Sequence, residues 1–176
     1  MSMTFGPVFP NYADLRYDVI LALEEGGQQR PQAYADGNGY ATIGIGFLVS
    51  ANAREILIAM GYSDPSAALV AAIQNAVAPN GTLIDFNNPN SGNGRTAHDR
   101  VRNALNNALQ NNGYPRAEFR FDYDSAGNPI PTAQWQANIK QAFVTAAQKY
   151  EDEVDLWLPQ GLITRKVPDT FRRLSN

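Results

Sequence analysis

Residues 24–47, EEGGQQRPQAYADGNGYATIGIGF, contain both changes of backbone pattern that decide the fold of this 176-residue chain. Before this stretch, from Tyr12 to Glu25, apolar residues recur at three- and four-residue steps, which predicts an amphipathic helix. The apolar positions are Leu15, Val19, Ile20 and Leu23. Gly26-Gly27 is expected to end the helix, because glycine commonly follows a helix C-terminus.

The second half of the stretch has the alternation of extended backbone. Asp36-Gly37-Asn38-Gly39 is a turn sequence, and the residues from Tyr40 to Phe47 leave it as a predicted strand. This strand places Tyr40 and Thr42 on one face. The opposite face carries Ile43, Ile45 and Phe47. We therefore predict a β-hairpin directly after the helix.

One carboxylate at the end of the helix and one in the turn of this hairpin suit glycoside hydrolysis. Glu25 ends the predicted helix, where we expect the helix dipole to raise its pKa, as a general acid requires. Asp36 in the turn would supply the base or nucleophile. A purely structural interpretation stays open, because Asp-Gly and Asn-Gly are common turn residues and threonine is common in strands.

The motif from Tyr34 to Gly46, Y-x-D-x-x-G-Y-x-T-I-G-I-G, preceded by Glu-Gly, resembles the N-terminal signature of the T4-like phage lysozymes. These glycoside hydrolases include phage endolysins and lysozyme-like bacterial toxin domains. The resemblance implies that Glu25 is the general acid and that Asp36 and Thr42 hold the attacking water. It is weaker around the glutamate, because the connector is longer here, and Glu24 is the neighbouring alternative.

The chain departs from that family at Phe47, where the family has a histidine that forms an ion pair. The one histidine of this chain, His98, lies far away in a helix-like segment, and we predict that it is a surface residue. The middle of the chain, residues 48–130, fits the family poorly. The resemblance returns in a long helix predicted from residue 131 to residue 158.

Composition narrows the classes of function. The chain has no cysteine, so neither a disulfide framework nor a thiolate metal site is available, and we expect no metal and no cofactor. The net charge of −3 argues against a nucleic-acid partner. No apolar run reaches the roughly 20 residues of a membrane span, and MSMTFGPVFPNY does not have the pattern of a signal peptide. We therefore expect delivery by phage lysis or by a dedicated secretion system.

Several further elements are predicted in the middle region. They are a helix from Ser50 to Met60 with an Asn52–Glu55 capping box and a stop at Gly61, a helix capped by Asp64 that ends near Val77, a loop over residues 79–95, a helix with a Thr96–Asp99 capping box that ends near Gly113, and a strand from Ala117 to Tyr123 followed by a turn over residues 125–128. The loop is expected to be a plain surface segment, with contact to substrate as the alternative.

The expected fold class is α+β, lysozyme-like, mainly helical with one or two small β-hairpins. One lysozyme-like domain spans residues 1–176, and it divides into the catalytic helix and hairpin (12–47), a divergent or inserted region (48–130), a linking helix (131–158), and the start of a second lobe that would be incomplete here (159–176).

The expected function is that of a muramidase acting in the periplasm or cell wall of a target bacterium. It would cleave the β-1,4 bond between N-acetylmuramic acid and N-acetylglucosamine in the glycan strands of peptidoglycan. A lytic transglycosylase is one alternative, because it needs the glutamate but no water-holding aspartate. A non-catalytic wall-binding or structural module of a phage tail or secreted toxin is another. Further expected partners are an immunity protein or the remainder of a larger protein.

Overall fold

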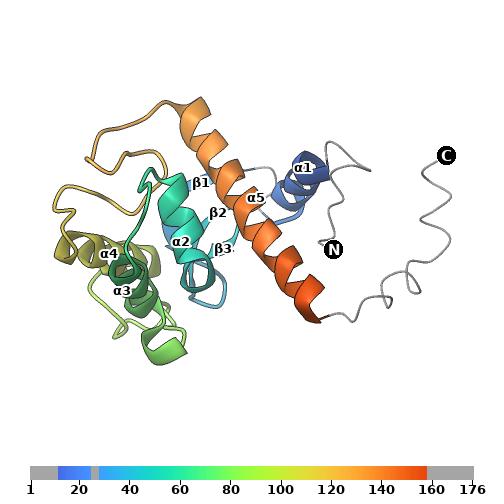
Figure 1. The fold of residues 1–176 in the computed structure, drawn as a ribbon. Helices are drawn as coiled ribbons and strands as arrows, with labels where there is room; N and C mark the ends of the chain where they lie inside the picture. Colours follow the sequence, from blue (N-terminus) through green and yellow to red (C-terminus); the bar gives the residue numbers. More distant parts are fainter. Residues whose placement is uncertain (1–11, 25–27, 158–176) are drawn as a thin grey trace, which may run out of the picture.

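A computed structural model of the chain describes residues 12–24 and 28–157 (Figure 1). In this part of the chain, helices surround a small antiparallel sheet, so the α+β class is confirmed. The elements are α1 (Tyr12–Glu24), β1 (Arg30–Ala35), β2 (Ala41–Gly44), β3 (Phe47–Leu48), α2 (Val49–Ala59), α3 (Ala67–Val77), the 3-10 helix η1 (Pro79–Gly81), α4 (Ala97–Asn111) and α5 (Thr132–Trp157).

The sheet has the strand order β1-β2-β3. Tyr34 of β1 lies opposite Thr42 of β2, and Thr42 in turn lies opposite Leu48 of β3. The predicted single strand from Tyr40 to Phe47 is therefore wrong: the chain reverses after β2 and forms a third strand. Gly44 and Gly46 permit this reversal, since their φ angles of 73° and 100° are disfavoured for residues with a side chain.

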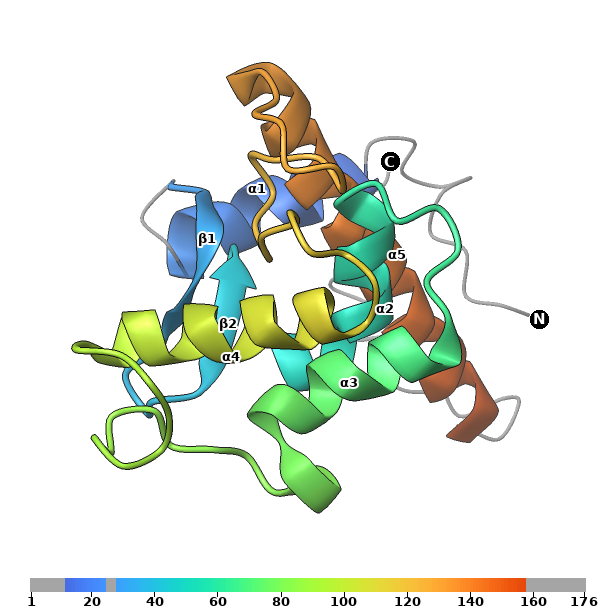
Figure 2. The same cartoon turned by 90° about the vertical axis from the view of Figure 1, so that its left-hand side faces the viewer.

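The free edge of β1 is covered by two segments that are distant in sequence. Helix α4 lies in front of the sheet in the view of Figure 2 and bonds to this edge through side chains on successive turns. The bonds are Phe121 N–H to Pro31 O (2.8 Å), Arg102 Nε to Ala33 O (3.0 Å) and Ala35 N–H to His98 Nδ1 (3.1 Å). Because its polar groups are paired in this way, the edge is closed to further strand pairing.

Helix α5 is confirmed as the long helix predicted after the middle region. It runs diagonally between α1 and α2 (Figure 1) and contributes buried side chains to a core shared with the sheet, α2, α3 and α4. The largest fully buried side chains of that core are Phe86, Phe119, Phe121, Ile43, Ile56, Leu57, Leu69, Ile73, Leu105, Leu109, Ile139 and Val49. Trp135 of α5 packs half-buried against this core.

Helix α1 is described from Tyr12 to Glu24, and its predicted apolar stripe is only partly correct, because Ile20 packs half-buried against the core but the other three positions do not. Leu15, Val19 and Leu23 are 62%, 46% and 76% exposed, whereas Tyr17 is 4% exposed. The Tyr17 ring packs edge-on against Phe143 of α5 with 5.6 Å between ring centroids. The buried face of α1 is therefore centred on Tyr17, with Ile20 and Leu21 half-buried beside it, and the other three aliphatic residues lie at the surface.

The predicted helix starts and stops are partly correct. The capping box of Thr96 and Asp99 is present at the start of α4, and Gly61 follows α2 with a φ of 95°. Helix α3 begins later than predicted, because the Ser66 hydroxyl, not Asp64, accepts the Leu69 N–H (3.2 Å). The predicted capping box of α2 is not formed, since Leu48 is the N-cap residue and no side chain caps it.

Residues 117–123 do not form the predicted strand. Buried and more exposed side chains do alternate here, because Ala117, Phe119 and Phe121 are buried. However, the segment forms only isolated β-bridges, at Gln32–Arg120 and Tyr123–Pro129, and no continuous ladder of strand hydrogen bonds. The side chains of α4 take the remaining hydrogen-bonding positions along the β1 edge, so no second continuous strand can pair there.

Candidate functional site

The predicted site is described in part. Glu25, the predicted acid, and the side chain of its rival Glu24 lie outside the described residues. Asp36 and Thr42 are described, and the hairpin brings them together. The described part of the predicted site is therefore the turn of Asp36 with the strand that carries Thr42.

Asp36 organises its own turn through one carboxylate oxygen. Its Oδ1 accepts the backbone N–H groups of Asn38 and Tyr40, both at 2.9 Å. The Asp36 N–H also donates to Tyr40 O (3.0 Å), and the Gly39 N–H donates to Asp36 O (2.9 Å). The local sequence explains this shape, because aspartate side chains readily accept from the backbone two residues ahead and glycine tolerates the positive φ of 83° at Gly39.

The second oxygen of Asp36 faces a strand hydroxyl. Thr42 is 4% exposed, and its Oγ1 lies 3.5 Å from Asp36 Oδ2 and 3.2 Å from Tyr40 O. At 3.5 Å the contact with Oδ2 is at most a weak hydrogen bond, so this oxygen keeps capacity to accept from a water molecule. The arrangement therefore offers a fixed carboxylate oxygen beside a hydroxyl, which can hold and polarise a water.

The loop predicted over residues 79–95 is packed against this turn. The Phe86 N–H donates to Gly39 O (2.9 Å), and a Cβ placed on Gly39 would lie 2.0 Å from Asp85 Oδ1. Only glycine fits at this contact. The motif D-G-N-G signals a turn, but no local pattern signals that residues 85–87 dock on it.

Arg100 of α4 holds the loop in place through hydrogen bonds to its backbone carbonyl groups. It is buried, and its guanidinium donates to Phe86 O through Nε (3.0 Å) and Nη2 (2.6 Å) and to Gly94 O through Nη1 (3.2 Å). Multiple carbonyl acceptors around one guanidinium give the loop a defined position, although most of residues 81–95 lie at the surface, as predicted. Arg100 is the main structural residue of this region that the sequence reading missed.

His98 is exposed, as predicted, but it also supports the site. Its Nδ1 accepts the N–H of Ala35, the residue before Asp36. Its ring stands edge-on to that of Tyr34, with centroids 6.2 Å apart, and the Arg30 guanidinium lies 4.6 Å from the centroid of Tyr34. Because Nδ1 is engaged with the backbone, the geometry indicates that His98 positions the end of β1.

Phe47 makes an aromatic contact in place of the ion pair that the resemblance led us to consider. Its ring lies 6.3 Å from that of Phe143 on α5, with a tilt of 42°. The first residue of β3 is thus joined to the long helix by apolar packing.

A second turn has the same backbone design as the turn of Asp36. Asp124 Oδ1 accepts the N–H groups of Ala126 (2.9 Å) and Asn128 (2.8 Å), and Gly127 has a φ of 85°. Here, however, the Asn128 amide also donates to Oδ2 (3.1 Å). The pKa of the Asp124 carboxyl is held below its usual range mainly by the hydrogen bond from the backbone N–H of Asn128. The hydrogen bond from the Asn128 side chain is the second largest cause.

Among residues 12–24 and 28–157, no three or more acidic or histidine side chains are grouped so that they could hold a metal ion. None of the helices in the same part of the chain has the length and apolar character needed to cross a membrane. Comparison with known protein families, with curated proteins and with solved structures finds no match to this chain.

Proposed function

We propose that this chain is a peptidoglycan hydrolase, a muramidase that cleaves the β-1,4 bond between N-acetylmuramic acid and N-acetylglucosamine. Its place of action would be the periplasm or cell wall of a target bacterium. The proposal rests on the lysozyme-like motif of the sequence together with the geometry of the hairpin.

The observation that carries the proposal is the contact between Asp36 and Thr42. One oxygen of Asp36 is saturated by two backbone N–H groups, which fixes the carboxylate, and the other faces a buried hydroxyl. A fixed acceptor beside a hydroxyl is what is needed to place a water for attack, since catalytic groups must be held in position before the substrate arrives.

In the proposed mechanism, Glu25 protonates the glycosidic oxygen and the bond to the anomeric carbon breaks. A water held by Asp36 Oδ2 and Thr42 attacks that carbon from the opposite face and gives up its proton to Asp36. Because the water attacks from the opposite face, this mechanism inverts the anomeric configuration, and it needs the two carboxyl groups to lie about 6.5 to 9.5 Å apart; a separation near 5 Å would instead favour a retaining mechanism in which Asp36 is the nucleophile.

A non-catalytic module is the second candidate, because one described feature favours it. The turn of Asp124 shows that the same hydrogen bonds arise where no site is proposed, so the turn of Asp36 is also consistent with a purely structural role. Such a module would bind the glycan strands of the wall without cleaving them.

The test is incubation of the purified chain with isolated peptidoglycan, followed by mass analysis of the released muropeptides. Wild type should release muropeptides with reducing ends, and Glu25→Gln should slow release by about 10² to 10⁴-fold with an unchanged circular dichroism spectrum. Anhydromuramyl products would identify a lytic transglycosylase instead. Wall binding in a pull-down without release of any product would identify the non-catalytic module.

A further inference from the structure

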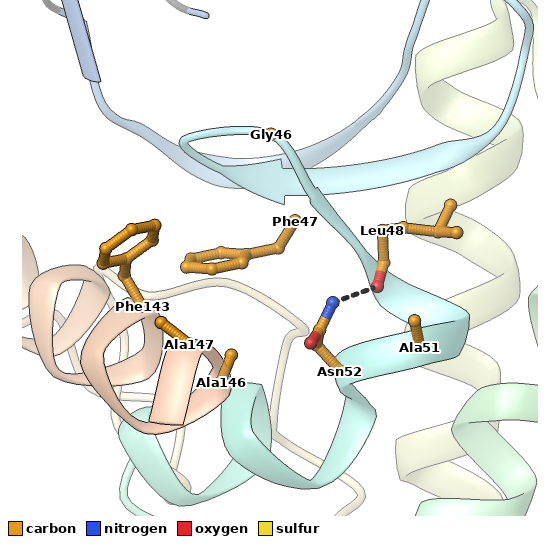
Figure 3. Close-up of a pocket in the computed structure, with 8 residues that line it drawn as sticks. All are labelled: Gly46, Phe47, Leu48, Ala51, Asn52, Phe143, Ala146 and Ala147. Carbon is orange, nitrogen blue, oxygen red and sulfur yellow. Dashed lines mark hydrogen bonds between the residues drawn. The ribbon is translucent and has the colours of Figure 1, made fainter. Parts of the chain in front are cut away.

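A cavity of about 340 Å³ lies between β3 with the first turn of α2 and the middle of α5 (Figure 3). Its walls are formed by eight residues: Gly46, Phe47, Leu48, Ala51, Asn52, Phe143, Ala146 and Ala147. The cavity adjoins the far end of β2 from Asp36, because Asp36 precedes that strand and Gly46 follows it. It is therefore a different place from the site proposed above.

Asn52 is the one polar side chain among these lining residues. It is 6% exposed, and its Nδ2 donates to Leu48 O (3.1 Å). Its Oδ1 is buried and has no hydrogen-bond partner. In Figure 3 the nitrogen is turned to the Leu48 carbonyl and the oxygen to the side of α5. The orientation of the amide is fixed chemically, because a carbonyl oxygen can accept only from the NH₂ group.

A structural role explains the NH₂ group of the Asn52 side chain but not its oxygen. Asn52 interrupts helical geometry, with φ −123° and ψ 22°, and its NH₂ group supplies a donor to the carbonyl that precedes α2. The oxygen has no such role in the fold. Buried polar atoms are nearly always paired, so an unpaired acceptor in the wall of an open cavity indicates a missing donor.

The cavity also restricts what can supply that donor. Its volume falls in the range of about 300 to 1,000 Å³ that is typical of small-molecule sites. Phe47 and Phe143 provide aromatic surfaces whose ring centroids are 6.3 Å apart, and no charged side chain is among the lining residues. A charged ligand would lose its hydration without compensation here. A ligand with an apolar ring and one N–H or O–H group would meet every requirement.

We propose that this cavity is a binding site for a small neutral aromatic molecule with a single hydrogen-bond donor, which Asn52 Oδ1 accepts. Indole and indene test this proposal, because they have nearly the same shape but indole has an N–H group where indene has a CH₂ group. Benzofuran places an acceptor at the same position.

The measurement is a titration of the isotope-labelled full chain with each probe, followed by NMR of the backbone amides of residues 46–52 and of the Asn52 side-chain amide. Indole should bind about five- to tenfold more tightly than indene, as expected for one neutral hydrogen bond, and benzofuran should bind most weakly. The Asn52 side-chain signal should move with indole and not with indene.

Two variants separate the donor contact from the fold. Asn52→Leu should bind indole and indene equally, but it also loses the bond to Leu48 O. Ala147→Leu keeps Asn52 and fills the cavity from α5, so it should abolish binding of both probes while the protein stays folded. Equal affinity of wild type for indole and indene would overturn the proposal. So would a crystal soaked with indole that holds only an ordered water on Asn52 Oδ1.

Discussion

The turns of Asp36 and Asp124 are two copies of one local design with different surroundings. In both, an aspartate oxygen accepts the N–H groups two and four residues ahead, and a glycine three residues ahead has a φ near 85°. The difference lies in the second oxygen. At Asp124 it accepts from the Asn128 amide (3.1 Å), whereas at Asp36 it faces the Thr42 hydroxyl at 3.5 Å.

This comparison shows that turn chemistry alone does not identify a catalytic aspartate. What distinguishes Asp36 is the buried strand hydroxyl beside its second oxygen and the loop that docks against the turn through Phe86. The turn of Asp124 therefore serves as an internal control for every test of Asp36.

The largest expected effect is on catalysis. Asp36→Asn should lower muropeptide release by about 10² to 10⁴-fold, since an amide can still accept the backbone N–H groups of the turn but cannot take a proton from water. Asp124→Asn makes the same chemical change in the same turn and should leave the rate unchanged. The assay is the mass analysis described above. Equal rates for the two variants would remove Asp36 from the mechanism.

The next effect is on stability, at the glycines of the two turns. Gly127→Ala should lower the free energy of unfolding by about 2 to 4 kcal/mol, because the new Cβ would lie 2.4 Å from the backbone oxygen of Arg116 at a positive φ. Gly39→Ala should cost somewhat less, because its closest clash, with Asp85 Oδ1, involves a side chain that can move.

Urea denaturation measures both losses, and Asp85→Ala sharpens the comparison. It should recover part of the stability lost in Gly39→Ala and none of that lost in Gly127→Ala. If Asp85→Ala rescued neither variant, the loop would not pack on the turn as the structure has it.

A smaller effect is expected at His98, which supports only the turn of Asp36. His98→Ala removes the acceptor of the Ala35 N–H and should cost about 1 kcal/mol, the usual net value of one hydrogen bond. Faster hydrogen exchange at Ala35, with no change at Asn128, is the specific sign. Asn107→Ala, at another exposed position of α4, is the matched control and should leave exchange at Ala35 unaltered.

The sequence predicts the two turns well because their chemistry is local. Asp36, Gly39 and Tyr40 are close in the chain, and their pattern is sufficient for a hairpin; the same is true of Thr96 and Asp99 at the start of α4. The approximate extents of most helices follow from periodicity for the same reason, although α3 begins after Ser66 and not after Asp64. The placement of Thr42 beside Asp36 follows from the register of that hairpin.

Prediction from the sequence fails where contacts between residues that are distant in the chain determine how a segment is placed. Arg100 holds carbonyl groups of a loop that precedes it, and His98 and Arg102 take hydrogen-bonding positions along β1 that a strand at 117–123 would need. The aliphatic residues of α1 satisfy a helical stripe, yet Leu15, Val19 and Leu23 of that stripe are exposed while Tyr17 packs against Phe143. No local pattern carries this information.

The smallest expected effect is that of Asp124 on the pKa of the buried side chain of Tyr62. Burial is the main cause that raises the pKa of Tyr62 to about 12, and the charges of Tyr114 and Asp124 add to it. An unfolded chain ionises tyrosine near pH 10, so the contribution of neutral Tyr62 to stability is present below pH 10 and is lost as the pH rises toward 12.

Asp124→Asn should lower the pKa of Tyr62 slightly, because a negative charge that opposes phenolate formation is removed, whereas Asp36→Asn should leave that pKa unchanged. Absorbance at the phenolate band during an alkaline titration measures the difference, with Tyr62→Phe identifying the late component. Tyr62→Phe should also retain full stability at neutral pH, since the Tyr62 hydroxyl is buried without a hydrogen-bond partner. A shift of the same size in both aspartate variants would mean that the two carboxylates are not distinguished by their positions, and the turn of Asp124 would lose its value as the control.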